Sequence, residues 1–216
     1  MAKNFKWGAE VSNGAPIHVV LFVSRNKDNK DVEGFTERRY SFITQSASDS
    51  EELARQFEAF VNSGVDGEMS RMYYSVNARN AEKIHRELLV YLINNPEFNL
   101  CSIQPKLAGI AAKRDCADEK HWLFDFDINS AERVDEFKQD ILALADTLKK
   151  PISVTVHRTP NGYAVITDRG FDTRPLYEKW NRDIVNLKRD DLLCCRWLRK
   201  GGMKMGLGIS ERKNSA

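Results

Sequence analysis

The sequence predicts an α/β protein of the α+β kind, with a mixed, largely antiparallel sheet and flanking helices. Three observations support this fold class. Short β-rich runs alternate apolar and polar residues, longer segments carry apolar stripes at helical spacing, and Asn, Gly and Pro gather between consecutive strands where hairpin turns would form. With 216 residues, of which 42% are hydrophobic, the chain can build one large core or two small ones.

The N-terminal half reads as a hairpin, a helix, a strand and two further helices. Residues 17–24 and 39–44 are strand-like and are separated by a polar turn segment. A helix begins at Ser50, Asn80 is the candidate N-cap of the next helix, and Pro105 begins a shorter one. The expected buried positions are Leu53, Phe57, Phe60 and Val61 in the first helix, Ile84, Leu88, Tyr91 and Leu92 in the second, and Leu107, Ile110 and Ala111 in the third. Residues 71–77 form the intervening strand, and we expect residues 1–115 to make an N-terminal α/β lobe.

The C-terminal half alternates strands and helices. A strand at residues 121–128 precedes a long helix that Ser130 would cap. Residues 152–157 and 163–167 then form two strands joined by a Pro-Asn-Gly turn, and a short helix follows at residues 173–180. Residues 184–187 and 192–198 are expected to form a last hairpin. The expected buried face of the long helix is Val134, Phe137, Ile141, Leu144 and Leu148. We assign residues 116–200 to a second lobe and residues 201–216 to a flexible basic tail.

Charge and cysteine content narrow the class of protein. The formal net charge of +2 is too small to identify a polyanionic partner, although the chain from Arg196 onward holds six Lys or Arg and one Glu. The four cysteines show no zinc-site spacing, which favours a reducing compartment. We find no membrane-spanning run, no signal peptide and none of the common phosphate-loop, dinucleotide, zincin or serine-hydrolase motifs. These observations predict a cytoplasmic protein without a membrane partner.

The strand at residues 121–128 carries the strongest chemical signal. Its side chains alternate, so Trp122, Phe124 and Phe126 would face a core while Asp125 and Asp127 share the opposite face. Asp is unfavourable in strands, and two carboxylates on one face repel each other unless a cation lies between them. The pair therefore suggests a site for Mg²⁺ or Mn²⁺. The alternative is an exposed strand end in which Asp127 only prepares the following turn.

From residue 120 onward, the element order and the Asp-Phe-Asp strand resemble the catalytic core of the archaeo-eukaryotic primase superfamily, including the primase-polymerases of phages and plasmids. The resemblance covers roughly the C-terminal half. It implies that Asp125 and Asp127 bind divalent metal and that a later acidic residue completes the metal site. Asp183, Asp190 and Asp191 all lie in the right region, and Asp183 is our first candidate.

The family also has a small-x-His strand that contacts nucleotide phosphates. The segment from Thr159 to Ile166 resembles it, but Ala164 stands where the histidine is expected. His157 is then the candidate catalytic histidine, and Arg158 the first candidate for phosphate contact. The other expected substrate-binding residues are Asn161, Tyr163, Lys188 and Arg196.

These features predict metal-dependent nucleotidyl transfer, like that of a primase or polymerase, with a nucleotide triphosphate and DNA or RNA as partners. A phage or plasmid protein acting in DNA replication would fit. Because the histidine is missing, a catalytically inactive protein of the same fold that binds nucleic acid or a host protein is the main alternative. A metal-dependent nuclease using the same aspartates is a third.

Overall fold

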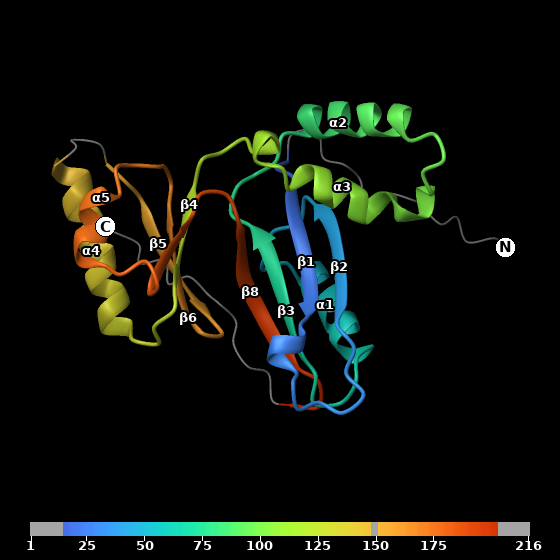
Figure 1. The fold of residues 1–216 in the computed structure, drawn as a ribbon, viewed down its shortest axis with the longest axis horizontal. Helices are drawn as coiled ribbons and strands as arrows, with labels where there is room; N and C mark the ends of the chain where they lie inside the picture. The colour runs from blue at the N-terminus through green and yellow to red at the C-terminus, as the bar shows by residue number, and fades with distance from the viewer. Residues whose placement is uncertain (1–14, 148–150, 203–216) are drawn as a thin grey trace.

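The computed structural model describes residues 15–147 and 151–202, which form two four-stranded sheets with α-helices packed on them (Figure 1). Every pairing between named strands is antiparallel, which confirms the α+β prediction, although the strands divide between two sheets instead of forming one. The first sheet has the order β2-β1-β3-β8 and consists of β1 (His18–Ser24), β2 (Arg38–Thr44), β3 (Met69–Ser75) and β8 (Leu192–Arg199). The second has the order β5-β6-β4-β7 and consists of β4 (Trp122–Phe126), β5 (Val154–Thr159), β6 (Gly162–Thr167) and β7 (Val185–Lys188). The helices are α1 (Glu51–Asn62), α2 (Ala81–Asn94), α3 (Ile103–Ala111), α4 (Ala131–Thr147) and α5 (Arg174–Lys179), with short 3₁₀ turns η1 (Asn26–Asp28), η2 (Leu100–Ser102) and η3 (Arg114–Cys116).

The second sheet and its helices follow one another as β4-α4-β5-β6-α5-β7. This is the β-α-β-β-α-β order of the ferredoxin-like split βαβ motif, with β4 and β6 as the two central strands. Helices α4 and α5 cover one face (Figure 1). Alternation along β4 sends Phe124 and Phe126 into the core beneath α4, where both contact Phe137. The other face of this sheet carries Asp125 and Lys188 together with Leu123 and Ala164.

The first sheet is covered on one face by α1. Ser50 caps that helix by accepting a hydrogen bond from the Leu53 amide, and Leu53 and Phe57 pack on Phe22 of β1 and Met72 of β3. Helices α2 and α3 lie over one end of the same sheet (Figure 1). Asn80 caps α2 as predicted. The face opposite α1 is turned toward the second sheet.

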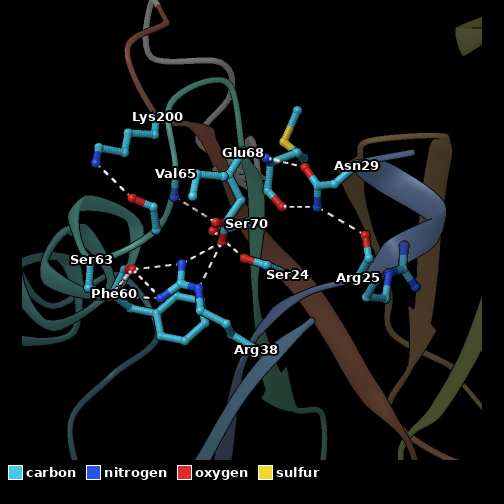
Figure 2. Close-up of polar contacts among 12 residues, drawn as sticks. Ser24, Arg25, Asn29, Arg38, Phe60, Ser63, Val65, Glu68, Ser70 and Lys200 are labelled. Carbon is cyan, nitrogen blue, oxygen red and sulfur yellow. Dashed lines mark hydrogen bonds and ion pairs between the residues drawn. The ribbon is translucent and has the colours of Figure 1, made fainter. Parts of the chain in front are cut away.

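A buried polar network fixes the far end of the first sheet (Figure 2). Glu68 is 2% exposed and accepts hydrogen bonds from Arg38 on β2 and from the Val65 amide. Arg38 also donates to the Phe60 carbonyl at the end of α1. Burial alone would raise the pKa of Glu68, but hydrogen bonds from Ser24, Arg38 and Val65 outweigh it and lower that pKa. The network joins β2, α1 and the turn before β3 on the α1 side of the first sheet.

The prediction that residues 184–187 and 192–198 form a hairpin is wrong. Strand β7 pairs with β4 in the second sheet, whereas β8 crosses to the first sheet and pairs with β3. The crossing is stabilised by Asp190, which forms a buried ion pair with Arg79, and by a hydrogen bond from the Val76 amide to the Asp191 carbonyl. Pairing with β3 also satisfies the free edge of that strand.

This crossing bears on the expected division into lobes. The boundary near residue 115 falls in η3, between the two sheets along the chain. The sequence predicts a second lobe that extends to residue 200, but residues 192–199 belong to the first sheet. The chain therefore passes between the two sheets twice, once before β4 and once between β7 and β8. Most of the tail from residue 201 lies outside the described residues.

The other predicted elements are confirmed with small shifts of their ends. The strand expected at residues 71–77 is β3, two residues earlier, and that expected at 152–157 is β5, two residues later. Of the four positions predicted to be buried in α2, only Ile84 is fully buried. Leu148, predicted to be buried in the long helix, lies outside the described residues. Within residues 15–147 and 151–202, no helix is both long and apolar enough to cross a membrane.

Candidate functional site in the cleft between the sheets

A cleft of about 490 Å³ lies between the two sheets. One wall, which we call the first-sheet wall, is formed by β1, β2, β3, the start of β8 and the residues that follow β1. The facing second-sheet wall is formed by β4, β6, β7, the β5-β6 turn and Asp191. The charged residues of the first-sheet wall are Arg25, Lys27, Glu37, Arg39 and Arg71, and those of the second-sheet wall are Asp125, Asp127, Lys188 and Asp191. Cations therefore predominate on one side and carboxylates on the other.

The two aspartates of the β4 segment both line this cleft, as the alternation predicted. Leu123 and Asp125 point away from the α4 core because their neighbours Phe124 and Phe126 are fully buried in it. Asp127 follows the last residue of β4 and is exposed. Asp125 is the more enclosed of the pair, with a side chain 34% exposed.

Lys188 links Asp125 to a third carboxylate. Its Nζ lies 3.1 Å from Asp125 Oδ2 and 3.4 Å from Asp191 Oδ2. The β4-β7 register explains the contact, because Lys188 is paired with Leu123 and so shares the cleft face with Asp125. Partial burial acts to lower the pKa of Lys188, but the Asp125 and Asp191 carboxylates raise it overall. Positive charge is thus stabilised between these two acids.

Of the three acidic residues left open by the sequence, Asp191 is the one that lines the cleft. Asp190, its neighbour, points the other way into the buried ion pair with Arg79. Asp183 is exposed in the turn before β7 and is not among the residues that line the cleft. The structure therefore brings Asp191, and not the first candidate Asp183, to the side of Asp125.

A row of cross-strand neighbours runs from β5 to β7 on the cleft face of the second sheet. His157 is paired with Ala164, Ala164 with Asp125, and Asp125 with Asn186. Ala164 lines the cleft directly beside Asp125, at the place where the resemblance to primases predicts a histidine. His157 is half-buried one strand further on, roughly 10 Å from Asp125 by strand spacing, and does not line the cleft.

The β5-β6 turn closes one end of the cleft. Asn161, expected as a substrate contact, lines it together with Thr159 and Pro160. A Cβ added at Gly162 would lie 2.2 Å from the Phe126 carbonyl oxygen, so only glycine lets this turn approach the end of β4 so closely. The Asn-Gly sequence thus places Asn161 near the acid-bearing strand.

Three other expected substrate residues lie elsewhere. Arg158 is paired with Tyr163, and its guanidinium stacks 4.8 Å from the centre of the Tyr163 ring. Tyr163 packs against the core under α4, which puts this stack on the helix-covered face of the sheet. Arg196 is paired with Met72 in the first sheet. None of the three lines the cleft, so their expected contact with phosphate has no support from their positions.

Sequence reasoning missed the first-sheet wall. Arg71 on β3 is 7% exposed and forms an ion pair with Asp28, which also pairs with Arg25. Tyr73 lies two residues further along the same face, and burial raises the pKa of its hydroxyl. Alternation with the buried Met72 could have placed Arg71 and Tyr73 on the face opposite α1. Nothing in the sequence indicated that this face meets the Asp125 strand.

The donor set suits a hard divalent cation in part. Carboxylate oxygens are the ligands that Mg²⁺ and Mn²⁺ prefer, and the Lys188 ammonium occupies a position where the carboxylates stabilise positive charge. However, within the described part of the chain no three His, Cys, Asp or Glu side chains are gathered into a set that could hold a metal ion. A cation would have to displace Lys188 from Asp125 or bind at Asp125 and Asp127.

Comparison of the chain with models of protein families finds no match, and comparisons with curated proteins and with solved structures find no match either.

Proposed function

We propose that the cleft carries out metal-dependent nucleotidyl transfer on a nucleotide or nucleic acid, as in primases and polymerases. One observation carries the proposal: a wall with three carboxylates faces a wall with four cationic side chains across a single cleft. Phosphoryl and nucleotidyl transfer need little covalent help from a protein, but they require divalent metal on the acidic side and neutralisation of the phosphate chain.

The acidic wall would hold the metal. Asp125, Asp127 and Asp191 supply oxygen donors, and a bound Mg²⁺ or Mn²⁺ would neutralise charge on the transferred phosphate. Lys188 has two possible partners on this wall, so it can turn from the carboxylates to a phosphate oxygen when a metal replaces its charge.

The cationic wall would hold the phosphate chain or the backbone of a nucleic acid. Arg39 and Lys27 line the cleft and form no ion pair with any of the residues that the structure describes, whereas Arg25 and Arg71 are held by Asp28. Arginine suits such contacts because its planar donors match phosphate geometry. Asn161 at the β5-β6 turn can add a neutral hydrogen bond from the other side.

A second function, binding without catalysis, is favoured by two observations. Ala164 gives no proton-transferring or phosphate-binding group beside Asp125, and Lys188 already forms ion pairs with both Asp125 and Asp191. On this alternative the cleft binds a polyanion through its cationic wall, and the carboxylates only orient Lys188.

Calorimetric titration of Mn²⁺ separates the two functions. We expect the wild type to bind Mn²⁺, the Asp125→Ala, Asp127→Ala double variant to lose binding, and Asp191→Ala to bind more weakly. Asp183→Ala is the matched control, because Asp183 is an exposed aspartate outside the cleft. Equal binding by the wild type and the double variant, or no binding at all, would refute the metal site. Retained Mn²⁺ binding without incorporation of labelled nucleotides would instead favour binding without catalysis.

A further inference from the structure

Residues 76–79, which we call the junction segment, follow β3 and contact both parts of the chain that carry cleft carboxylates. Asn77 is 1% exposed and Arg79 is 3% exposed, so two strongly polar side chains are buried where the sheets join. Buried polar groups cost free energy unless they are fully bonded, and in some proteins such groups fix one arrangement over others.

The Asn77 carboxamide bridges two distant segments. Its Oδ1 accepts a hydrogen bond of 2.7 Å from the His121 amide, directly before β4. Its Nδ2 donates to Asp190 Oδ1 at 3.0 Å and to the His121 carbonyl at 3.2 Å. One side chain therefore ties the start of the strand that carries Asp125 to the residue next to Asp191.

Arg79 holds the second of these segments from the other side. Its guanidinium lies 2.8 Å from Asp190 Oδ2, and the Val76 amide donates to the Asp191 carbonyl at 3.1 Å. With Asp190 and the Asp191 backbone held, the Asp191 side chain turns to the cleft, where its Oδ1 accepts from the Leu192 amide at 2.7 Å and its Oδ2 reaches Lys188.

We propose that Asn77 and Arg79 are positioning residues that fix Asp191 relative to Asp125 in the cleft. The proposal rests on the proposed function for its chemical meaning, because the two carboxylates would share a cation. Neither residue lines the cleft, so both act through Asp190 and the start of β4. Partners that orient metal ligands from outside typically change metal affinity by about 10-fold to 100-fold when they are removed.

Two variants test the positioning role. Asn77→Ala removes the bridge without leaving a buried charge. The double variant Arg79→Met, Asp190→Asn removes both charges of the ion pair together. We expect each to bind Mn²⁺ about tenfold more weakly than the wild type. We also expect faster hydrogen exchange of the Leu192 amide, relative to the Phe124 amide in the core, because the Asp191 carboxylate that accepts from Leu192 is no longer held.

The matched control is the double variant Arg38→Met, Glu68→Gln, which removes another buried ion pair at the far end of the first sheet (Figure 2). It should lower the thermal midpoint while leaving Mn²⁺ affinity and the relative exchange of the Leu192 amide unchanged. If the junction variants change those two quantities no more than this control does, the two residues are only structural and the positioning role is refuted. A wild type that binds no Mn²⁺ would overturn the proposed function, and relative exchange of the Leu192 amide would then decide the positioning role alone.

Discussion

Replacing Lys188 with methionine should change metal binding and phosphate binding in opposite directions. The ammonium lies 3.1 Å from Asp125 Oδ2 and 3.4 Å from Asp191 Oδ2, on the wall where we place the cation. Lys188→Met keeps a flexible side chain of similar length and removes the charge. A divalent cation then no longer competes with the ammonium for these carboxylates, while a phosphate chain loses one attractive charge.

The magnitude follows from the exposure of the pair. The Lys188 and Asp125 side chains are 36% and 34% exposed, so solvent screens the pair, and the value for bulk water gives the smallest effect to expect. Two unit charges about 4 Å apart then interact by about 1 kcal/mol, and a divalent ion doubles this value. Screening by salt reduces it to about 1.4 kcal/mol, which corresponds to about tenfold in the dissociation constant.

We therefore expect Lys188→Met to bind Mn²⁺ about tenfold more tightly in calorimetry and to bind metal-free inorganic triphosphate more weakly. Lys188→Arg keeps the charge and serves as the control, with Mn²⁺ affinity close to that of the wild type. Unchanged or weaker Mn²⁺ binding by Lys188→Met would show that the cation does not bind beside Lys188, and the assignment of Asp125 and Asp191 would fail.

Three further predictions concern stability and reactivity. Arg38→Met leaves the Glu68 carboxylate buried without its partner and should lower the free energy of unfolding, measured by urea titration, by roughly 3 kcal/mol. A decrease of less than about 1 kcal/mol would contradict the stabilising role of this network. Burial lowers the pKa of His18 below 6.5, so the unfolded chain binds a proton before the folded one does, and the stability of the fold should decrease as the pH drops through 6.5. Thermal melts at about pH 7.5 and about pH 5 should show a weaker pH dependence for His18→Gln than for the wild type. An identical pH dependence in both proteins would refute this reasoning. Iodoacetamide at neutral pH should alkylate the exposed Cys101 and spare Cys194 and Cys195, because burial raises the pKa of both buried thiols to about 12. Mass spectrometry of the native protein measures the labelling, and alkylation of Cys194 or Cys195 as fast as that of Cys101 would contradict this prediction.

Local patterns in the sequence were sufficient for most secondary structure. The helix start at Ser50, the cap at Asn80, the stripe of Leu53 and Phe57, and the alternation around Phe124 depend on neighbours within a few residues, and each is found as expected. The hairpin expected for β7 and β8 failed because the choice of partner strand is not local. Strand β8 pairs with β3, which precedes it by more than a hundred residues.

The candidate site shows the same limit. Asp125, Asp127, Asn161 and Lys188 were predicted and line the cleft. Arg158 and Tyr163 were also predicted to contact substrate, but Tyr163 is paired with the core residue Phe126 and Arg158 with Tyr163, so both lie on the helix-covered face. The role of Asp191 could not be separated from that of Asp183 or Asp190, because the three differ in tertiary contacts and not in local pattern.

By itself, the sequence determined which elements form, and that the Asp125 strand presents carboxylates on the face opposite its core, because alternation and capping are properties of short segments. Only the tertiary structure decided what faces those carboxylates. The cationic wall comes from strands far earlier in the chain, and the crossing of β8 at Asp190 brings it across from the acids. Such an arrangement depends on long-range pairing and on which faces pack together, and neither leaves a periodic signal in the residues themselves.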